Sequence, residues 1–250
     1  MGREEIREKA LERTRKQLAE TDRVKLMVKA VKNLDRAASS WTEDVEAFRD
    51  WYSLHFPELE NEIQDDEQLV KILSREVDRN NLKSFNEMAE ESTGMYLGEE
   101  DRKMLQDFVN SLEERLDLKQ RLEQYVHDIA MEEMPNTSIL LGPVLAARMV
   151  KLAGGLEDLA RKPSSTIQVL GAEKALFRHL KEGGNPPKHG ILFQHEYVKR
   201  LHPDSRGKMA RFIANKTAIA ARIDQYGDKE KGEALREECR EKFEELKEEE

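Results

Sequence analysis

The sequence has one cysteine in 250 residues, Cys239. A single thiol forms no disulfide within the chain and no thiolate metal cluster, and such low cysteine use is typical of a reducing compartment. No run of about 18 apolar residues occurs, and no secretory signal pattern is present. We therefore expect an intracellular protein without a membrane-spanning segment.

Residues typical of a catalytic or metal site are also missing. The six histidines include no HExxH pair, and no Cys/His spacing indicates zinc. No GxxxxGK[ST] or GxGxxG pattern is present to hold phosphates, and Ser164-Ser165 lacks the context of a nucleophile elbow. We therefore expect no catalytic residue, no metal, no cofactor and no enzymatic activity. The histidines are His55, His127, His179, His189, His195 and His202.

Proline and glycine are scarce in the first half of the chain. Residues 1–134 hold one proline, Pro57, whereas the other six prolines begin at Pro135. Because such residues punctuate helices and turns, this shift predicts a boundary between a first domain over 1–134 and a second over 135–250.

Two long runs in the first domain carry apolar residues every three or four positions, over residues 24–52 and 105–129. This spacing predicts two long helices with a coiled-coil seam, which Lys119 and Glu123 interrupt in the second run. The insertion between them, about 57–98, places them most simply as an antiparallel pair with a helical tip.

The tip is predicted to hold one further amphipathic helix that contains Leu69, Ile72, Leu73, Val77 and Leu82. Large apolar residues also gather near it, and they favour either a self-association surface or a compact small core. These residues are Trp51, Tyr52, Leu54, Phe56, Met88, Met95 and Tyr96.

The second domain is predicted to be helical as well, because no alternation longer than four residues indicates a strand. The fold class is therefore all-α. We expect helices over residues 140–152, 156–160, 204–226 and 232–246, an extended piece over 167–170 and a short apolar piece over 191–193.

Charge is distributed unevenly along the chain. The net charge is −9, from 42 Lys+Arg and 51 Asp+Glu. Residues 139–225 contain 15 Lys+Arg and 7 Asp+Glu, a net charge of +8. The remaining residues contain 27 Lys+Arg and 44 Asp+Glu, a net charge of −17. A basic segment within an acidic chain suggests binding of a polyanion, although a solvated basic face is the alternative.

The predicted helix over 204–226 carries cations along one edge. Lys208, Arg211, Asn215 and Arg222 share one arc, and Met209, Phe212, Ile213, Ile219, Ala220 and Ile223 occupy the neighbouring arc. The apolar arc is expected to pack, while the edge contacts phosphates without reading sequence.

Residues 171–190, GAEKALFRHLKEGGNPPKHG, are predicted to combine a glycine turn, a Glu-Lys pair, a short basic amphipathic helix and a rigid loop of Gly, Pro, Lys and His. Lys174, Arg178, Lys181 and Lys188 supply positive charge. His189 and His195 supply rings able to stack on an unpaired base, unless they are ordinary surface histidines. Leu176 and Phe177 alternatively anchor the helix in the core.

The strings GAEKALFR at 171–178 and GKMARFIANKTAIAARID at 207–224 resemble the Nop-domain family, the scaffolds of box C/D ribonucleoproteins. The resemblance covers about residues 27–250, including LLGPVLAARMVKLAGG and the closing EECREKFEELK. It implies an antiparallel coiled coil that forms homodimers, followed by an all-α Nop domain.

The resemblance also implies a function. The chain would be a non-catalytic scaffold for guide-directed 2′-O-methylation of rRNA or tRNA. It would bind the composite surface of a kink-turn box C/D guide RNA and its bound ribosomal-like protein, in an archaeal-type cytoplasm or a eukaryotic nucleolus. A spliceosomal small-RNP scaffold of the same family and a coiled-coil adaptor without RNA binding remain alternatives.

The family pattern places a set of residues at or near the RNA, and His195 matches a histidine that stacks in splicing relatives. The predicted RNA-binding residues are Gly171, Ala172, Glu173, Lys174, Ala175, Leu176, Phe177, Arg178, Lys188, His189, His195, Lys208, Arg211, Asn215 and Arg222. Family scaffolds normally carry an N-terminal domain that binds fibrillarin. This sequence begins in the coiled-coil lead-in, so we expect fibrillarin as a partner only if the native protein has that domain. The lysine-rich tail of eukaryotic relatives is absent, which favours an archaeal type.

Overall fold

The computed structural model describes residues 5, 7, 8, 11, 22–183, 185–227 and 229–249. Every regular element in these ranges is a helix, which confirms the all-α class. The chain divides into two compact units, one of residues 32–124 and one that joins residues 1–31 to 125–250. The predicted domain boundary between residues 134 and 135 stays a prediction.

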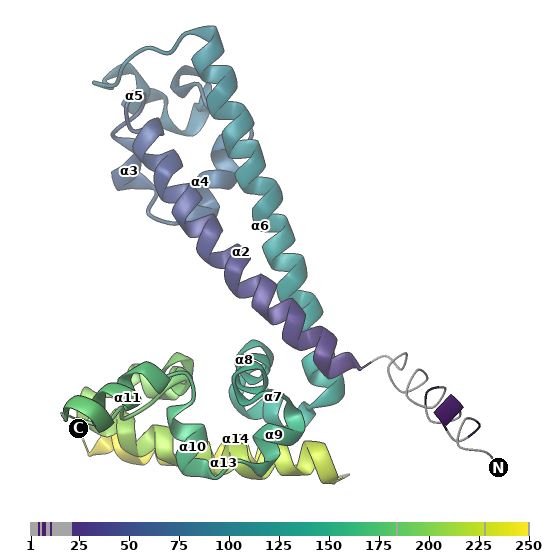
Figure 1. Ribbon diagram of the computed structural model, residues 1–250. Helices are drawn as coiled ribbons and strands as arrows, with labels where there is room; N and C mark the ends of the chain where they lie inside the picture. The colour runs from purple at the N-terminus through teal and green to yellow at the C-terminus, as the bar shows by residue number, and fades with distance from the viewer. Residues whose placement is uncertain are drawn as a thin grey trace. The chain divides into compact units, whose positions relative to one another are not determined.

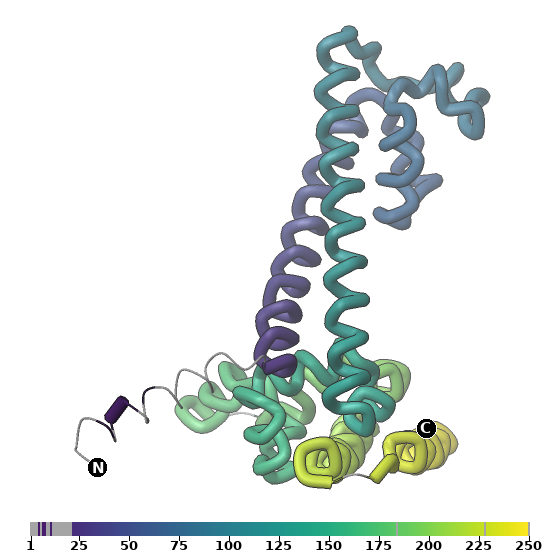
Figure 2. The backbone as a smooth tube through the Cα atoms, turned by 90° about the vertical axis from the view of Figure 1, so that its right-hand side faces the viewer, coloured from purple at the N-terminus to yellow at the C-terminus, as the bar shows by residue number. Residues whose placement is uncertain are grey.

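Helices α2 (Arg23–Tyr52) and α6 (Glu99–Glu133) run antiparallel and side by side, and most of each lies in the unit of residues 32–124 (Figures 1 and 2). The Trp41 indole N–H donates to the Leu112 carbonyl at 3.0 Å, and Asp44 pairs with Arg115. Phe48 is fully buried against α6. The predicted pair of long packed helices is therefore confirmed.

Lys119 interrupts the apolar seam of α6, and the structure gives it two partners. Its ammonium nitrogen lies 2.9 Å from the Glu67 carboxylate and 4.9 Å from the centre of the Trp41 ring. A cation over an indole face is attracted by the ring quadrupole. The polar residue therefore joins the seam to the tip.

The tip comprises α3 (Leu59–Glu62), α4 (Asp66–Leu73), two 3₁₀ turns, η1 (Arg79–Asn81) and η2 (Lys83–Phe85), and α5 (Asn86–Glu90). The predicted helix that continues to Leu82 is wrong, because α4 ends at Leu73. Val77 and Leu82 are buried as expected, but they lie outside any helix, in the irregular segments before and after η1. The Asp78 carboxylate caps the first turn by accepting from the Asn80 N–H at 3.0 Å.

A buried arginine holds the tip together. The Arg79 guanidinium donates to the carbonyls of His55 and Gly94 at 2.5 and 2.8 Å and to the Ser92 hydroxyl at 3.1 Å. The His55 ring accepts from the Arg79 backbone N–H and meets the Met95 carbonyl at 2.9 Å. These bonds fix the loop before α6 against the end of α2.

The large apolar residues of the tip divide between the two predicted roles. Tyr52 and Phe56 are 3% and 1% exposed and belong to the core, with Met88 packed partly against it. Trp51, Leu54, Met95 and Tyr96 are 40%, 51%, 55% and 84% exposed. The tip therefore has both a small core and an exposed apolar patch, called the tip patch below and defined by these four exposed residues.

The helical module contains α7 to α14 with α13 (Pro203–Tyr226) at its centre, packed against α7, α9, α10, α12 and α14 (Figure 1). The other elements are α7 (Pro135–Leu141), α8 (Pro143–Ala153), α9 (Leu156–Arg161), α10 (Ser164–Val169), α11 (Glu173–Glu182), η3 (Ile191–Gln194), α12 (Glu196–Arg200) and α14 (Gly232–Glu248).

Two predictions for this module are corrected. The expected helix over 140–152 is divided between α7 and α8, because Gly142 has φ +84° and Pro143 starts a new helix. The expected extended piece over 167–170 is largely part of α10. Ile167 is fully buried there, and α10 packs on α13, so tertiary packing overrides the local preference.

The Asp224 carboxylate of α13 binds the start of α7. It accepts from the backbone N–H groups of Asn136 and Thr137 at 3.0 and 2.8 Å, and from their side chains at 2.8 and 2.6 Å. The Asn136 side-chain oxygen in turn accepts from the Lys231 N–H at 2.6 Å, just before α14. This Asp224 clamp satisfies donors that a helix start leaves unpaired and fixes three helices together.

Candidate nucleic-acid interface

The interface begins at the turn before α11. Gly171 has φ +82°, a conformation that side chains disfavour, and its N–H donates to the Glu173 carboxylate at 2.9 Å. Glu173 therefore orders the turn from within the chain. A negative charge in the first turn also favours the start of α11.

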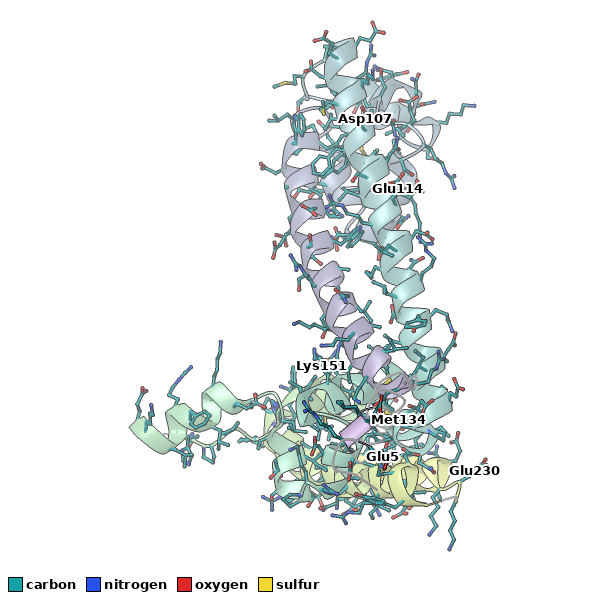
Figure 3. The ribbon with its side chains drawn as sticks, turned by 45° about the vertical axis from the view of Figure 1, so that its right-hand side comes forward. Glu5, Asp107, Glu114, Met134, Lys151 and Glu230 are labelled. Carbon is teal, nitrogen blue, oxygen red and sulfur yellow. The ribbon has the colours of Figure 1, made fainter. Side chains whose placement is uncertain are left out.

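Helix α11 has no buried residue and extends away from the rest of the module (Figures 2 and 3). Phe177 and Leu180 are 63% and 69% exposed, so the alternative that Phe177 anchors the helix in the core is wrong. Lys174 and Arg178 are exposed, and neither has an ion-pair partner among the described residues. The helix presents cations and apolar side chains together.

The loop that follows α11 is fixed to α10 by its backbone. The Gly190 N–H donates to the Gln168 carbonyl at 2.8 Å, and the Gln168 side chain donates to the Lys188 carbonyl at 2.7 Å. A Cβ placed on Gly190 would lie 1.9 Å from the Leu170 carbonyl oxygen. Gly190 is therefore required for the close approach that sets the positions of Lys188 and His189.

Replacing Gly190 with alanine is expected to lower the melting temperature by about 2–10 °C, because overpacking costs about 1–3 kcal/mol. Thermal unfolding followed by circular dichroism measures this. Gly207→Ala is the matched control, since its Cβ would make an ordinary 3.4 Å contact with Lys188 within a helix. Equal melting temperatures for Gly190→Ala and Gly207→Ala would contradict the close approach.

His189 belongs to a stack of three side chains. Its ring lies 4.9 Å from the Phe193 ring at an interplanar angle of 20°, and the Arg206 guanidinium lies 5.3 Å from the same Phe193 ring. Arg206 is held in place by the Leu201 carbonyl at 2.9 Å. Burial and the neighbouring cations lower the pKa of His189, which keeps the ring neutral.

Sequence reasoning missed Phe193 and Arg206. Phe193 is 38% exposed beside a half-buried His189, so this stack reaches the surface. The sequence could have indicated this stack, because the aromatic Phe193 lies four positions after His189 and the basic Arg206 lies at the start of the long helix α13.

The prediction that His195 stacks on a base is wrong for this structure. The side chain is only 6% exposed, its Nε2 lies 3.2 Å from the Leu140 carbonyl oxygen, and its Nδ1 accepts from the Tyr197 N–H. His195 is thus the N-cap of α12, and both ring nitrogens are engaged. A ring in this position offers no face to a ligand.

Burial gives His195 and His55 a pKa below the ordinary value of 6.5. The unfolded chain therefore binds protons that the folded chain does not, and the free energy of unfolding decreases as pH falls below about 6.5. Urea titrations at pH 7.5 and 5.5 measure this loss. It is expected to be smaller in His195→Gln, and an unchanged pH dependence in that variant would contradict the assignment.

The exposed edge of α13 follows the predicted spacing. Lys208, Arg211, Asn215 and Arg222 are all exposed on it. Ile219, which was predicted to pack, is 41% exposed and lies on the same edge. The Arg222 guanidinium also donates to the Ala160 carbonyl at 3.1 Å, so this residue has a structural role at the end of α9.

The structure brings the start of α13 next to the loop. A Cβ at Gly207 would meet the Lys188 side chain at 3.4 Å, and one at Gly171 would meet Ile191 at the same distance. The loop, the His189 stack and the first turns of α13 thus form one surface, which α11 joins through Gly171.

Other kinds of site find no support in the described ranges. No group of three metal-ligating side chains occurs there. No helix in these ranges is long and apolar enough to cross a membrane.

Comparison with known proteins adds the family. A model of the Nop family, described as snoRNA binding domain, fibrillarin, matches residues 31–245. A NOP5 family protein of Methanocaldococcus jannaschii is 38% identical over 216 residues, 81% of this chain and 51% of that protein. Nucleolar protein 56 of Bos taurus is 33% identical over 216 residues, 78% of this chain and 36% of that protein. A chain of a solved fibrillarin/Nop5p complex is 26% identical, covering 86% of this chain and 78% of that chain, with a TM-score of 0.47.

The fold and surface define a helical protein with a long two-helix hairpin and a basic helical module that exposes aromatic side chains. The chain belongs to the Nop family, and it spans about half or less of the length of these two curated relatives.

Proposed function

We propose that the protein is a non-catalytic scaffold of a box C/D ribonucleoprotein for guide-directed 2′-O-methylation of RNA. The supporting observation is the continuous surface formed by the loop, the His189 stack and the first turns of α13, with the exposed α11 beside it. Its arginines and lysines suit phosphate oxygens, and its flat side chains suit unpaired bases.

The ligand is proposed to be a composite of RNA and protein. Phe177 and Leu180 project from α11 next to Lys174 and Arg178. RNA phosphates can pair with these cations, whereas the large exposed aliphatic and aromatic side chains favour a protein partner that buries them. A kink-turn RNA carrying its ribosomal-like protein supplies both kinds of contact.

Charge favours binding at the module. Residues 32–124 contain 12 Lys+Arg and 24 Asp+Glu, a net of −12. Asp107 and Glu114 lie seven residues apart on α6 and are exposed (Figure 3). This unit repels a polyanion, so RNA is directed to the basic segment over 139–225.

A gel-shift titration tests the proposal on kink-turn box C/D RNA, with and without the kink-turn-binding protein, at two salt concentrations. The expected result is a further shift when that protein is present. No shift from folded protein in either condition would overturn the proposal and favour the coiled-coil adaptor. Equal binding to a spliceosomal kink-turn RNA would favour the splicing alternative.

We also propose that the tip patch takes part in homodimer formation. Trp51 and Leu54 are exposed in the single chain, and a dimer through the tip patch would bury them. Replacing both with serine is expected to weaken such a dimer at least tenfold, since truncating large side chains at the centre of an interface removes much of the binding energy. Analytical ultracentrifugation measures the change. Leu180→Ser is the control on α11, and an equal effect there would contradict a role of the tip patch.

Fibrillarin is proposed as a partner only where the native protein carries the N-terminal domain of the family scaffolds. The proposed location is the cytoplasm of an archaeal-type cell, or the nucleolus of a eukaryote, as the names of the eukaryotic relatives indicate for those proteins.

A further inference from the structure

We propose that the acidic end of α14 competes with RNA phosphate for Lys208, an inference that rests on the proposed function. The Lys208 ammonium lies 3.3 Å from the Glu249 carboxylate, and both side chains are more than half exposed. A residue predicted to bind RNA is thus already paired with an anion of its own chain.

The pair is part of an ordered contact between two helices. Lys216, eight residues after Lys208 on α13, pairs with Glu238, eleven residues before Glu249 in the sequence, as expected for two antiparallel helices. Phe243 and Leu246 are buried at 2% and 1% exposure, which fixes α14 on the module. Glu249 follows Leu246 by about one helical turn, so its carboxylate is held near Lys208.

A second cation of the surface is held in a similar way. The Lys188 ammonium lies 3.9 Å from the Asp204 carboxylate. By contrast, Lys174, Arg178 and Arg211 have no ion-pair partner within the described ranges. The surface therefore contains both unpaired cations and cations that carry an internal counter-ion.

Carboxylate and phosphate oxygens accept from the same ammonium group. RNA that reaches Lys208 must displace Glu249, and the displaced carboxylate then repels the nearby phosphates. This cost lowers the affinity most for RNA that binds through charge alone, because a complete protein–RNA ligand also makes stacking and apolar contacts. The acidic end of α14 thereby favours the complete ligand over unstructured RNA.

Glu249→Gln tests the proposal, with two probes: a single-stranded RNA of matched length, and the kink-turn RNA bound to its protein. Binding of the single strand is expected to tighten about two- to fivefold, the effect of releasing one exposed ion pair, with a smaller change for the complete ligand. Glu238→Gln is the matched control, because it removes the same charge from the same helix beside Lys216, which lies outside the predicted RNA-binding residues.

A double-mutant cycle with Lys208→Ala distinguishes local competition from a change in net charge. The gain from Glu249→Gln is expected to vanish when Lys208 is absent. The same gain in the Lys208→Ala background or in Glu238→Gln, or no gain at all, would overturn the proposal. If the wild-type protein binds neither probe, the proposed function fails and this inference fails with it; if it binds and only Glu249→Gln is silent, this inference alone fails.

Discussion

Replacing Lys174, Arg178 and Arg211 together with alanine is expected to lower the affinity for the kink-turn RNA and its protein by roughly tenfold or more. Each side chain is exposed and suited to a phosphate contact. Each lost contact lowers the slope of log affinity against log salt by about 0.7–0.9. Titrations at about 50 and 200 mM salt measure both the affinity and its salt slope.

The control for this variant removes the same charge from the other unit. Lys32, Lys83 and Lys103 are exposed within residues 32–124. Their replacement by alanine is expected to leave affinity and salt slope nearly unchanged. A triple variant of the proposed surface that keeps the wild-type salt slope, with an unchanged circular dichroism spectrum, would remove these cations from the RNA interface.

Asp224→Ala is expected to lower the free energy of unfolding of the helical module by about 2–4 kcal/mol, because it leaves four donors of Asn136 and Thr137 without their acceptor. For a chain of this size, this corresponds to a melting temperature lower by about 5–15 °C. Calorimetry measures the change. The position is far more sensitive than an exposed carboxylate because a helix start depends on it.

Two further variants serve as comparisons for Asp224→Ala. Asp224→Asn keeps one acceptor oxygen and is expected to have an intermediate effect. Asp107→Ala removes an exposed carboxylate from α6 and is expected to change stability by less than about 0.5 kcal/mol. Equal stability of Asp224→Ala and Asp107→Ala would show that the Asp224 clamp contributes little.

Several features of the interface followed from the sequence because they depend on local spacing. The edge of α13 required only helical periodicity, so Lys208, Arg211 and Asn215 share one exposed face as predicted. The turn at Gly171 and the start of α11 also follow from local chemistry, since glycine permits the positive φ. The role of these residues in binding RNA stays a prediction.

Other features depended on residues distant in the sequence. The burial of His195 requires the carbonyl of Leu140, 55 positions earlier, and no local pattern indicates that contact. Ile219 has the spacing of a packing residue, but its side chain is 41% exposed. The sequence suggested stacking for His195 from its chemical type and from its match to a family position, whereas packing placed Phe193 and Arg206 beside His189 instead.

The sequence by itself determined the helical class, the long antiparallel pair and the basic segment, because hydrophobic period and charge are properties of neighbouring residues. Only the tertiary structure decided which side chains are buried, which cations have a counter-ion and where the turns are held. Those outcomes depend on contacts between segments far apart in the chain, such as Asp224 with Asn136 and Lys208 with Glu249.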